Sequence, residues 1–135
     1  MSTRSSITVR SKDNERLSAY CHHDGYLEGV GETLLKNYNS KEKALELVKL
    51  GDMSSLGEQI ASKEGQQHSF DNADEGVTVY YGRDRGETGT EPRVLKETEE
   101  IDSQQFNYYH DGIRWTVGGK DLKSLLEKYT NKQEV

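Results

Sequence analysis

The sequence predicts a single α+β domain in which helices pack on one face of an antiparallel β-sheet. Two observations predict this class. Short runs that alternate apolar and polar residues occur near both ends of the chain, and apolar residues at helical spacing lie between and after them. Because 135 residues match the size of one domain, we expect residues 1–135 to fold together.

The first predicted element is a β-hairpin. Residues 7–10 and 17–21 alternate apolar and polar side chains, and turn-forming residues separate the two runs. Alternation places Cys21 on the core face and His22 on the other face. Cys21 is therefore expected to be a buried, apolar side chain.

Two helices are predicted next. A capping-box pattern, Asn39 with Glu42, precedes the apolar run 44–50, and Gly51 is placed to end that helix. The helix before it is expected to bury one face made of Val30, Leu34 and Tyr38.

The middle of the chain predicts a short helix, a loop, a strand and a polar excursion. Asp52 is placed to cap the short helix. Residues 62–75 lack periodicity and are predicted to form a loop. Residues 76–81 favour a strand, and residues 86–100 are polar and hold the one proline.

A second hairpin is the clearest local signal. Asp-Gly at residues 111–112, between residues 106–110 and 113–117, is typical of a two-residue type I′ turn. This register pairs Tyr108 with Trp115 on an aromatic core face.

The opposite face of this hairpin is a candidate surface for a homo-oligomer. The two-residue turn would pair Tyr109 with Arg114 there, and both residue types are enriched at protein interfaces. A final amphipathic helix is predicted from Leu122, Leu125, Leu126 and Tyr129, and residues 131–135 are expected to fray.

Composition excludes several function classes. The formal net charge of −6 makes a nucleic-acid backbone an unfavourable general partner. No apolar run reaches membrane-spanning length, so no membrane partner is expected. One cysteine excludes an internal disulfide and favours a reducing compartment, and no leader-like apolar stretch opens the chain. We therefore expect a cytoplasmic protein.

The first candidate binding stretch covers residues 21–31. His22 is a candidate general base, metal ligand or hydrogen-bond donor to phosphate, and the amides of Gly29 and Gly31 are candidates to bind an anion because a helix begins there. Asp24 belongs to the same stretch. The structural alternative is a turn at residues 24–25 with Asp24 as the helix cap.

The second candidate stretch is Tyr80, Tyr81, Arg83 and Arg85. The arginine guanidiniums can donate paired hydrogen bonds to a phosphate or a carboxylate, and the tyrosines are candidates to stack on a base. A salt-bridged strand end is the alternative.

The third candidate stretch contains His68 and Asp71, which would assist a metal ion or a proton transfer; Ser69 would complete a catalytic triad in composition, but no nucleophile elbow surrounds it. The alternative is a loop that Phe70 anchors. We predict no metal and no cofactor, because no ligand motif occurs and neighbouring His22 and His23 would point to opposite faces of a regular strand.

Six short motifs occur in the first two thirds of the chain: STRSSITV (2–9), YCHHDGY (20–26), GVG (29–31), LGDMSSL (50–56), HSFD (68–71) and GRDRGE (82–87). With these motifs the chain resembles, over roughly residues 1–88, a family of small tailed-phage and prophage proteins. Members of that family commonly read CHWDGYPEGVG, where this chain has His23 and Leu27. The resemblance implies a phage accessory product acting in the host bacterial cytoplasm.

We expect a binding protein that neutralises a host factor, most specifically by sequestering a small, nucleotide-like anion. Arg83 and Arg85 would hold phosphate, and His22 would assist. The first alternative is a small hydrolase of a phosphodiester or ADP-ribose-type bond, with His22 or His68 as base and Asp71 assisting. A second alternative is an acidic inhibitor that binds a host enzyme. A third is a structural component of the virion.

Overall fold

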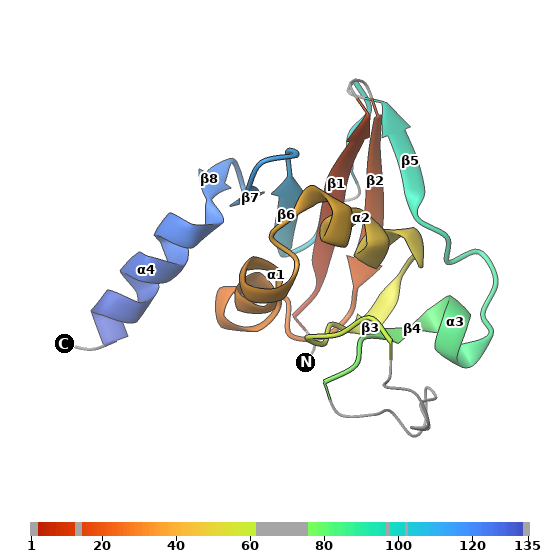
Figure 1. Cartoon of the computed structure of the whole chain (residues 1–135), viewed down its shortest axis with the longest axis horizontal. Helices are drawn as coiled ribbons and strands as arrows, with labels where there is room; N and C mark the ends of the chain where they lie inside the picture. Colours follow the sequence, from red (N-terminus) through yellow and green to blue (C-terminus); the bar gives the residue numbers. More distant parts are fainter. Residues whose placement is uncertain (1–2, 13–14, 62–75, 97, 102, 134–135) are drawn as a thin grey trace.

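The computed structural model describes residues 3–12, 15–61, 76–96, 98–101 and 103–133. Within them, one sheet of 8 strands is combined with short helices, which confirms the α+β class (Figure 1). The strands are β1 (Ser5–Lys12), β2 (Glu15–Cys21), β3 (Met53–Ser55), β4 (Val79–Tyr80), β5 (Arg93–Lys96), β6 (Phe106–His110), β7 (Trp115–Val117) and β8 (Lys120–Asp121). The helices are a π-helical turn η1 (Leu27–Gly31), α1 (Glu32–Asn37), α2 (Lys41–Lys49), α3 (Tyr81–Arg85) and α4 (Leu122–Gln133).

The sheet is mixed, whereas the sequence predicted an antiparallel one. Its strand order is β4-β3-β2-β1-β6-β7-β8, and β5 pairs with β2 beside β3. β1 pairs with β6, and β2 with β3, in parallel. Alternation predicts strands but not their direction, and in both parallel pairs a long connection lies between the two strands in the chain.

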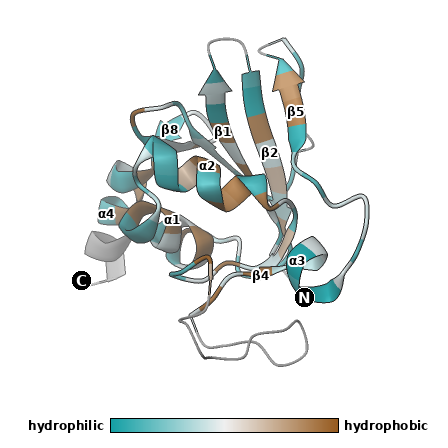
Figure 2. Cartoon of the chain, turned by 45° about the vertical axis from the view of Figure 1, so that its right-hand side comes forward, coloured by the Kyte–Doolittle hydropathy of each residue, from teal (hydrophilic) through white to brown (hydrophobic). Residues whose placement is uncertain are grey.

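The β1–β2 hairpin forms as predicted and builds the core. Its inner face carries Ile7, Val9 and Ala19 against α2, which crosses these two strands in Figure 2. Cys21 is fully buried, as predicted, and burial raises the pKa of its thiol to about 12. We call the opposite side of the sheet, where Thr8 and its even-numbered neighbours lie, the outer face.

The predicted helices after the hairpin are confirmed, with one capping correction. Val30, Leu34 and Tyr38 are buried, as their spacing predicted. The N-cap of α2 is Ser40, whose hydroxyl accepts a hydrogen bond from the Lys43 amide at 3.2 Å. Asn39 lies one residue before the cap, and its carbonyl is hydrogen-bonded to the His110 ring at 2.9 Å. Gly51 follows α2 in the left-handed region that favours glycine (φ +91°).

The helix predicted after Asp52 does not form. Residues 53–55 make β3 instead, and the Asp52 carboxylate accepts a hydrogen bond from the Tyr20 amide at 2.9 Å. Asp52 therefore accepts a hydrogen bond at the edge of a strand instead of capping a helix. Its partial burial raises the pKa of the Asp52 carboxyl, partly offset by this hydrogen bond.

The chain after residue 75 also differs from prediction. The strand predicted over residues 76–81 ends at Tyr80, and Tyr81 begins the short helix α3. The polar excursion contains a strand, β5, in which Leu95 is buried and pairs with Arg16 of β2. Four residues of alternation inside a polar stretch were too weak a signal to predict it.

The second hairpin forms with a longer loop than predicted. Tyr108 pairs with Val117 and His110 with Trp115, so four residues, 111–114, connect the strands. The register therefore differs by two residues, which leaves every side chain on its predicted face. Tyr109 faces Thr116, and the predicted Tyr109–Arg114 pair is not formed.

Asp111 explains the longer loop. Its carboxylate accepts hydrogen bonds from the amides of Ile113 (2.9 Å) and Arg114 (3.0 Å), and its own amide donates to the Arg114 carbonyl. Partial burial acts to raise the pKa of Asp111, but these amides outweigh it and lower that pKa below its ordinary value.

The C-terminal helix is confirmed as α4. Leu122 is fully buried, whereas Leu125 and Leu126 are half-buried against the core. The helix continues through Gln133, and residues 134–135 lie outside the described part, so the predicted fraying of residues 131–135 stays a prediction. Within the described residues, none of the helices has the length and apolar character needed to cross a membrane.

We predict that Asp111→Ala lowers the free energy of unfolding by about 1 kcal/mol, because two loop amides lose their acceptor. The difference is fully present at neutral pH and shrinks as the pH falls through the lowered pKa, since only the carboxylate accepts both bonds well. Urea unfolding at pH 7 and pH 3 measures it. Asp111→Asn, which keeps one oxygen, is the control, and equal stability of wild type and Asp111→Ala at pH 7 would contradict the prediction.

Candidate functional site

The three predicted stretches have different outcomes. His68, Ser69 and Asp71 lie outside the described residues, so their predicted roles stay predictions. The other two stretches are described in full. Most of their side chains are engaged within the fold, and a smaller group gathers at one end of the sheet.

Tyr80 is part of the core. Its side chain is fully buried, and its hydroxyl donates to the Leu47 carbonyl of α2 at 2.6 Å. Burial strongly raises the pKa of this phenol. A ring held in this way does not fit the predicted role of stacking on a base.

Arg83 is a structural anchor. Its guanidinium donates to Asp84 (2.8 Å), to the Ile60 carbonyl (2.6 Å) and to the Thr78 carbonyl (2.9 Å). It also lies over the Tyr80 ring, 4.8 Å from the ring centre. The predicted phosphate role does not fit this geometry, which matches the alternative of a salt-bridged strand end. Arg85 is exposed at the end of α3.

The glycines of the first stretch serve close packing. A Cβ on Gly29 would lie 2.3 Å from the Asp24 carbonyl oxygen, and one on Gly31 would lie 3.2 Å from the Tyr108 hydroxyl. Both amides point to the Tyr26 carbonyl, at 3.0 and 3.5 Å. The predicted anion site at these amides is therefore already occupied by the chain's own carbonyl.

Asp24 forms the corner that precedes η1. Its backbone is left-handed (φ +56°), which aspartate tolerates better than most residues, and its carbonyl accepts from the Val30 amide at 2.8 Å. Its carboxylate accepts from the Tyr26 hydroxyl at 3.2 Å. This is the turn that the structural alternative predicted.

Tyr20, His22 and His23 remain together at the end of β2. The Tyr20 hydroxyl and His22 Nδ1 are 2.6 Å apart, and the two imidazole rings lie edge to face, 4.6 Å between centres. The prediction that the histidines point to opposite faces is wrong. The regular strand ends at Cys21, so strict alternation no longer holds beyond it.

Electrostatics keep His22 neutral. Partial burial, then His23, then Arg4 lower the pKa of His22 below its ordinary value. Burial also raises the pKa of the Tyr20 phenol, which therefore keeps its proton at neutral pH. When the phenol donates to Nδ1, the imidazole proton is on Nε2; when the phenol accepts from Nδ1–H, Nε2 is free of a proton.

Arg4 and Tyr81 complete what we call the Tyr20 cluster: Arg4, Tyr20, His22, His23 and Tyr81. Arg4 is exposed, and its charge acts on both Tyr20 and His22. No side chain in the described part of the protein hydrogen-bonds its guanidinium. Tyr81 acts electrostatically on Tyr20, and its amide donates to the Asp52 carbonyl at 3.2 Å. The two motif stretches therefore meet here.

Sequence reasoning missed Arg4 and Tyr20 as site residues. Tyr20 and His22 are two residues apart, and this spacing was a usable signal because such residues share a face of extended chain.

Among the described residues, no group of three or more His, Cys, Asp or Glu side chains could hold a metal ion. No protein-family model, curated protein or solved structure matches this chain.

We predict that Arg83→Ala lowers the free energy of unfolding by about 2 kcal/mol, because the buried Asp84 and two carbonyls lose a charged donor. Chemical denaturation measures the loss. Arg85→Ala removes the same charge from an exposed site on the same helix and should change stability by less than about 0.5 kcal/mol. Equal effects of the two variants would contradict the anchoring role.

We predict that NMR titration finds the pKa of His22 below 6.5 and that Arg4→Gln shifts it upward, because one positive charge is removed. Since the unfolded state takes up the proton first, wild-type stability falls as the pH drops through 6.5 toward the folded pKa. His22→Gln should flatten that slope. A His22 pKa at or above 6.5 would show that burial and Arg4 do not act as described.

Proposed function

We propose that this protein is a phage-encoded accessory protein that works in the host bacterial cytoplasm by sequestering a small, nucleotide-like anion at the Tyr20 cluster. The observation that carries the proposal is an exposed arginine, Arg4, beside two imidazoles and two tyrosines. The resemblance to phage proteins over residues 1–88 supports the biological setting. Removal of such a molecule would neutralise the host factor that depends on it.

Each group in the cluster has a distinct role in this proposal. The Arg4 guanidinium binds phosphate oxygens through paired, charge-assisted hydrogen bonds. Neutral His22 donates its Nε2 proton to the ligand, since Nδ1 is taken by Tyr20. Tyr81 supplies an aromatic surface for a base. Arg4 thus takes the phosphate-binding role that the sequence suggested for Arg83 and Arg85, and His22 keeps its assisting role.

A hydrolase is the second candidate, and a specific observation favours it. A neutral imidazole held at 2.6 Å by a tyrosine hydroxyl is a suitable proton acceptor if the hydroxyl accepts from Nδ1 and Nε2 faces the substrate. His22 would then activate water for attack on a phosphodiester or ADP-ribose-type bond. The binding and hydrolase hypotheses differ in whether the ligand is released unchanged.

Native mass spectrometry and calorimetry with mono-, di- and cyclic nucleotides test both candidates. We expect one nucleotide to bind at the Tyr20 cluster and to be recovered unchanged. Arg4→Gln and His22→Gln should each weaken binding by about tenfold or more. Arg4→Gln removes a charge-assisted hydrogen bond to phosphate, and His22→Gln removes the hydrogen bond from Nε2 to the ligand. Arg114→Gln is the matched control, since it removes the same charge from the exposed loop at the far end of β6.

The other results are equally informative. A chemically altered nucleotide, lost on His22→Gln, would establish the hydrolase. Equal affinity of Arg4→Gln and Arg114→Gln would show that the Tyr20 cluster is not the site. Absence of any complex across the panel, with a host protein co-purifying at low salt, would instead support the acidic interaction inhibitor.

A further inference from the structure

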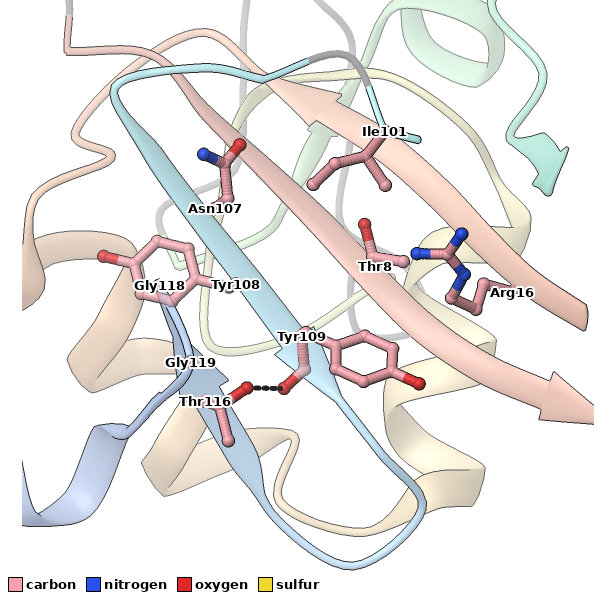
Figure 3. A pocket seen from close by; sticks show the side chains of 9 residues that line it. All are labelled: Thr8, Arg16, Ile101, Asn107, Tyr108, Tyr109, Thr116, Gly118 and Gly119. Carbon is pink, nitrogen blue, oxygen red and sulfur yellow. Dashed lines mark hydrogen bonds between the residues drawn. The ribbon is translucent and has the colours of Figure 1, made fainter. Parts of the chain in front are cut away.

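We propose that the outer face carries a second ligand site, a groove that binds a nucleoside monophosphate through its planar base. The groove has a volume of ≈ 240 Å³ and crosses the middle of the sheet (Figure 3). Thr8 lies four residues along β1 from Arg4, about 13 Å at the rise of a strand. The site is therefore distinct from the Tyr20 cluster and goes beyond the proposed function.

The groove has the size and walls for one flat ring system. Sites for drug-sized ligands start at about 300 Å³, so this groove suits a single base rather than a larger ligand. Tyr109, Ile101 and Arg16 surround Thr8 in Figure 3. An aromatic ring, an aliphatic side chain and a guanidinium are the groups on which bases stack.

The floor of the groove is polar in composition but already satisfied. The Thr8 hydroxyl is hydrogen-bonded to the Ser18 hydroxyl at 2.9 Å. The Thr116 hydroxyl donates to the Tyr109 carbonyl at 3.3 Å (Figure 3). The floor therefore presents methyl groups and flat backbone rather than open hydrogen-bonding groups. This favours the face of a ring over a polar head group.

Charge at one end of the groove indicates an anionic ligand. Arg10 and Arg16 are directly opposite each other on β1 and β2, a like-charge pair that is unfavourable in a sheet. The Arg16 guanidinium donates to the carbonyls of Lys96 (2.8 Å) and Glu99, and its Nε is buried without a hydrogen bond to any described residue. The Glu99 carboxylate accepts from the Lys96 amide at 3.0 Å. A phosphate at this end of the groove would be held by the positive charge of Arg16, which lines the groove.

The opposite end of the groove is open. Gly118 and Gly119 form the β7–β8 turn with left-handed backbones, φ +57° and +82°. A Cβ on either glycine would meet no atom within 4 Å. A ligand edge can therefore approach this turn closely, which a side chain would hinder.

¹⁵N NMR titration with AMP, GMP, CMP and UMP tests the site. We expect amide shifts to concentrate at Thr8, Arg16, Tyr109, Thr116 and Gly118. Tyr109→Ala should weaken binding by about tenfold and Tyr109→Phe should restore it, because stacking needs the ring and not the hydroxyl. Thr116→Trp should abolish binding by filling the groove. Arg4→Gln should leave this binding unchanged, which separates the groove from the Tyr20 cluster.

Three results would overturn the proposal. The first is no groove shift with any of the four nucleotides at millimolar concentration. The second is equally strong binding of inorganic phosphate alone, which would show that the base of the nucleotide is not recognised. The third is unchanged affinity in a folded Thr116→Trp variant, checked by its amide spectrum. Loss through Arg4→Gln with no effect of Thr116→Trp would assign all binding to the Tyr20 cluster.

Discussion

The structure depends on how the outer edge of β2 is satisfied. β5 pairs with residues 15–18 of that edge and β3 pairs with Cys21, which leaves the Tyr20 amide between them. The Asp52 carboxylate accepts that amide, while its own backbone binds Thr90 and Tyr81. One aspartate therefore joins β2, the approach to β5 and the start of α3, and it fixes where Tyr20 and Tyr81 meet.

A second constraint acts on the helices of the inner face, because short connections join them to each other and to the sheet. The corner between α1 and α2 is held by the second hairpin: the Trp115 indole donates to the Tyr38 carbonyl at 2.9 Å, and His110 to Asn39. The Gly112 amide donates to His110 Nδ1, so the imidazole proton is on Nε2. Distant parts of the chain are thus joined through backbone carbonyls, and the glycines at 29 and 31 allow the same close approach.

Local pattern predicted the elements that depend on local physics: the first hairpin, the buried faces of α1 and α2, the burial of Cys21 and α4. It did not predict strand direction, β5 or the register of the second hairpin. Those depend on tertiary pairing and on one side chain, Asp111, that competes with a two-residue turn. Of the predicted site, His22 and Tyr81 belong to the Tyr20 cluster, whereas Arg4 joins it only through folding.

The residues that looked most like a site are mainly those that hold the fold. Glycine beside charged residues suits a binding rim, but it equally suits a tight corner in which arginine and aspartate must satisfy exposed carbonyls and amides. Arg83 and Asp84 show this second use, since their side chains hydrogen-bond each other and backbone groups of the protein. Arg4 differs from Arg83, because it is exposed and no side chain of the described residues hydrogen-bonds its guanidinium. By that criterion the Tyr20 cluster is a better candidate for a ligand site than the glycine motifs themselves.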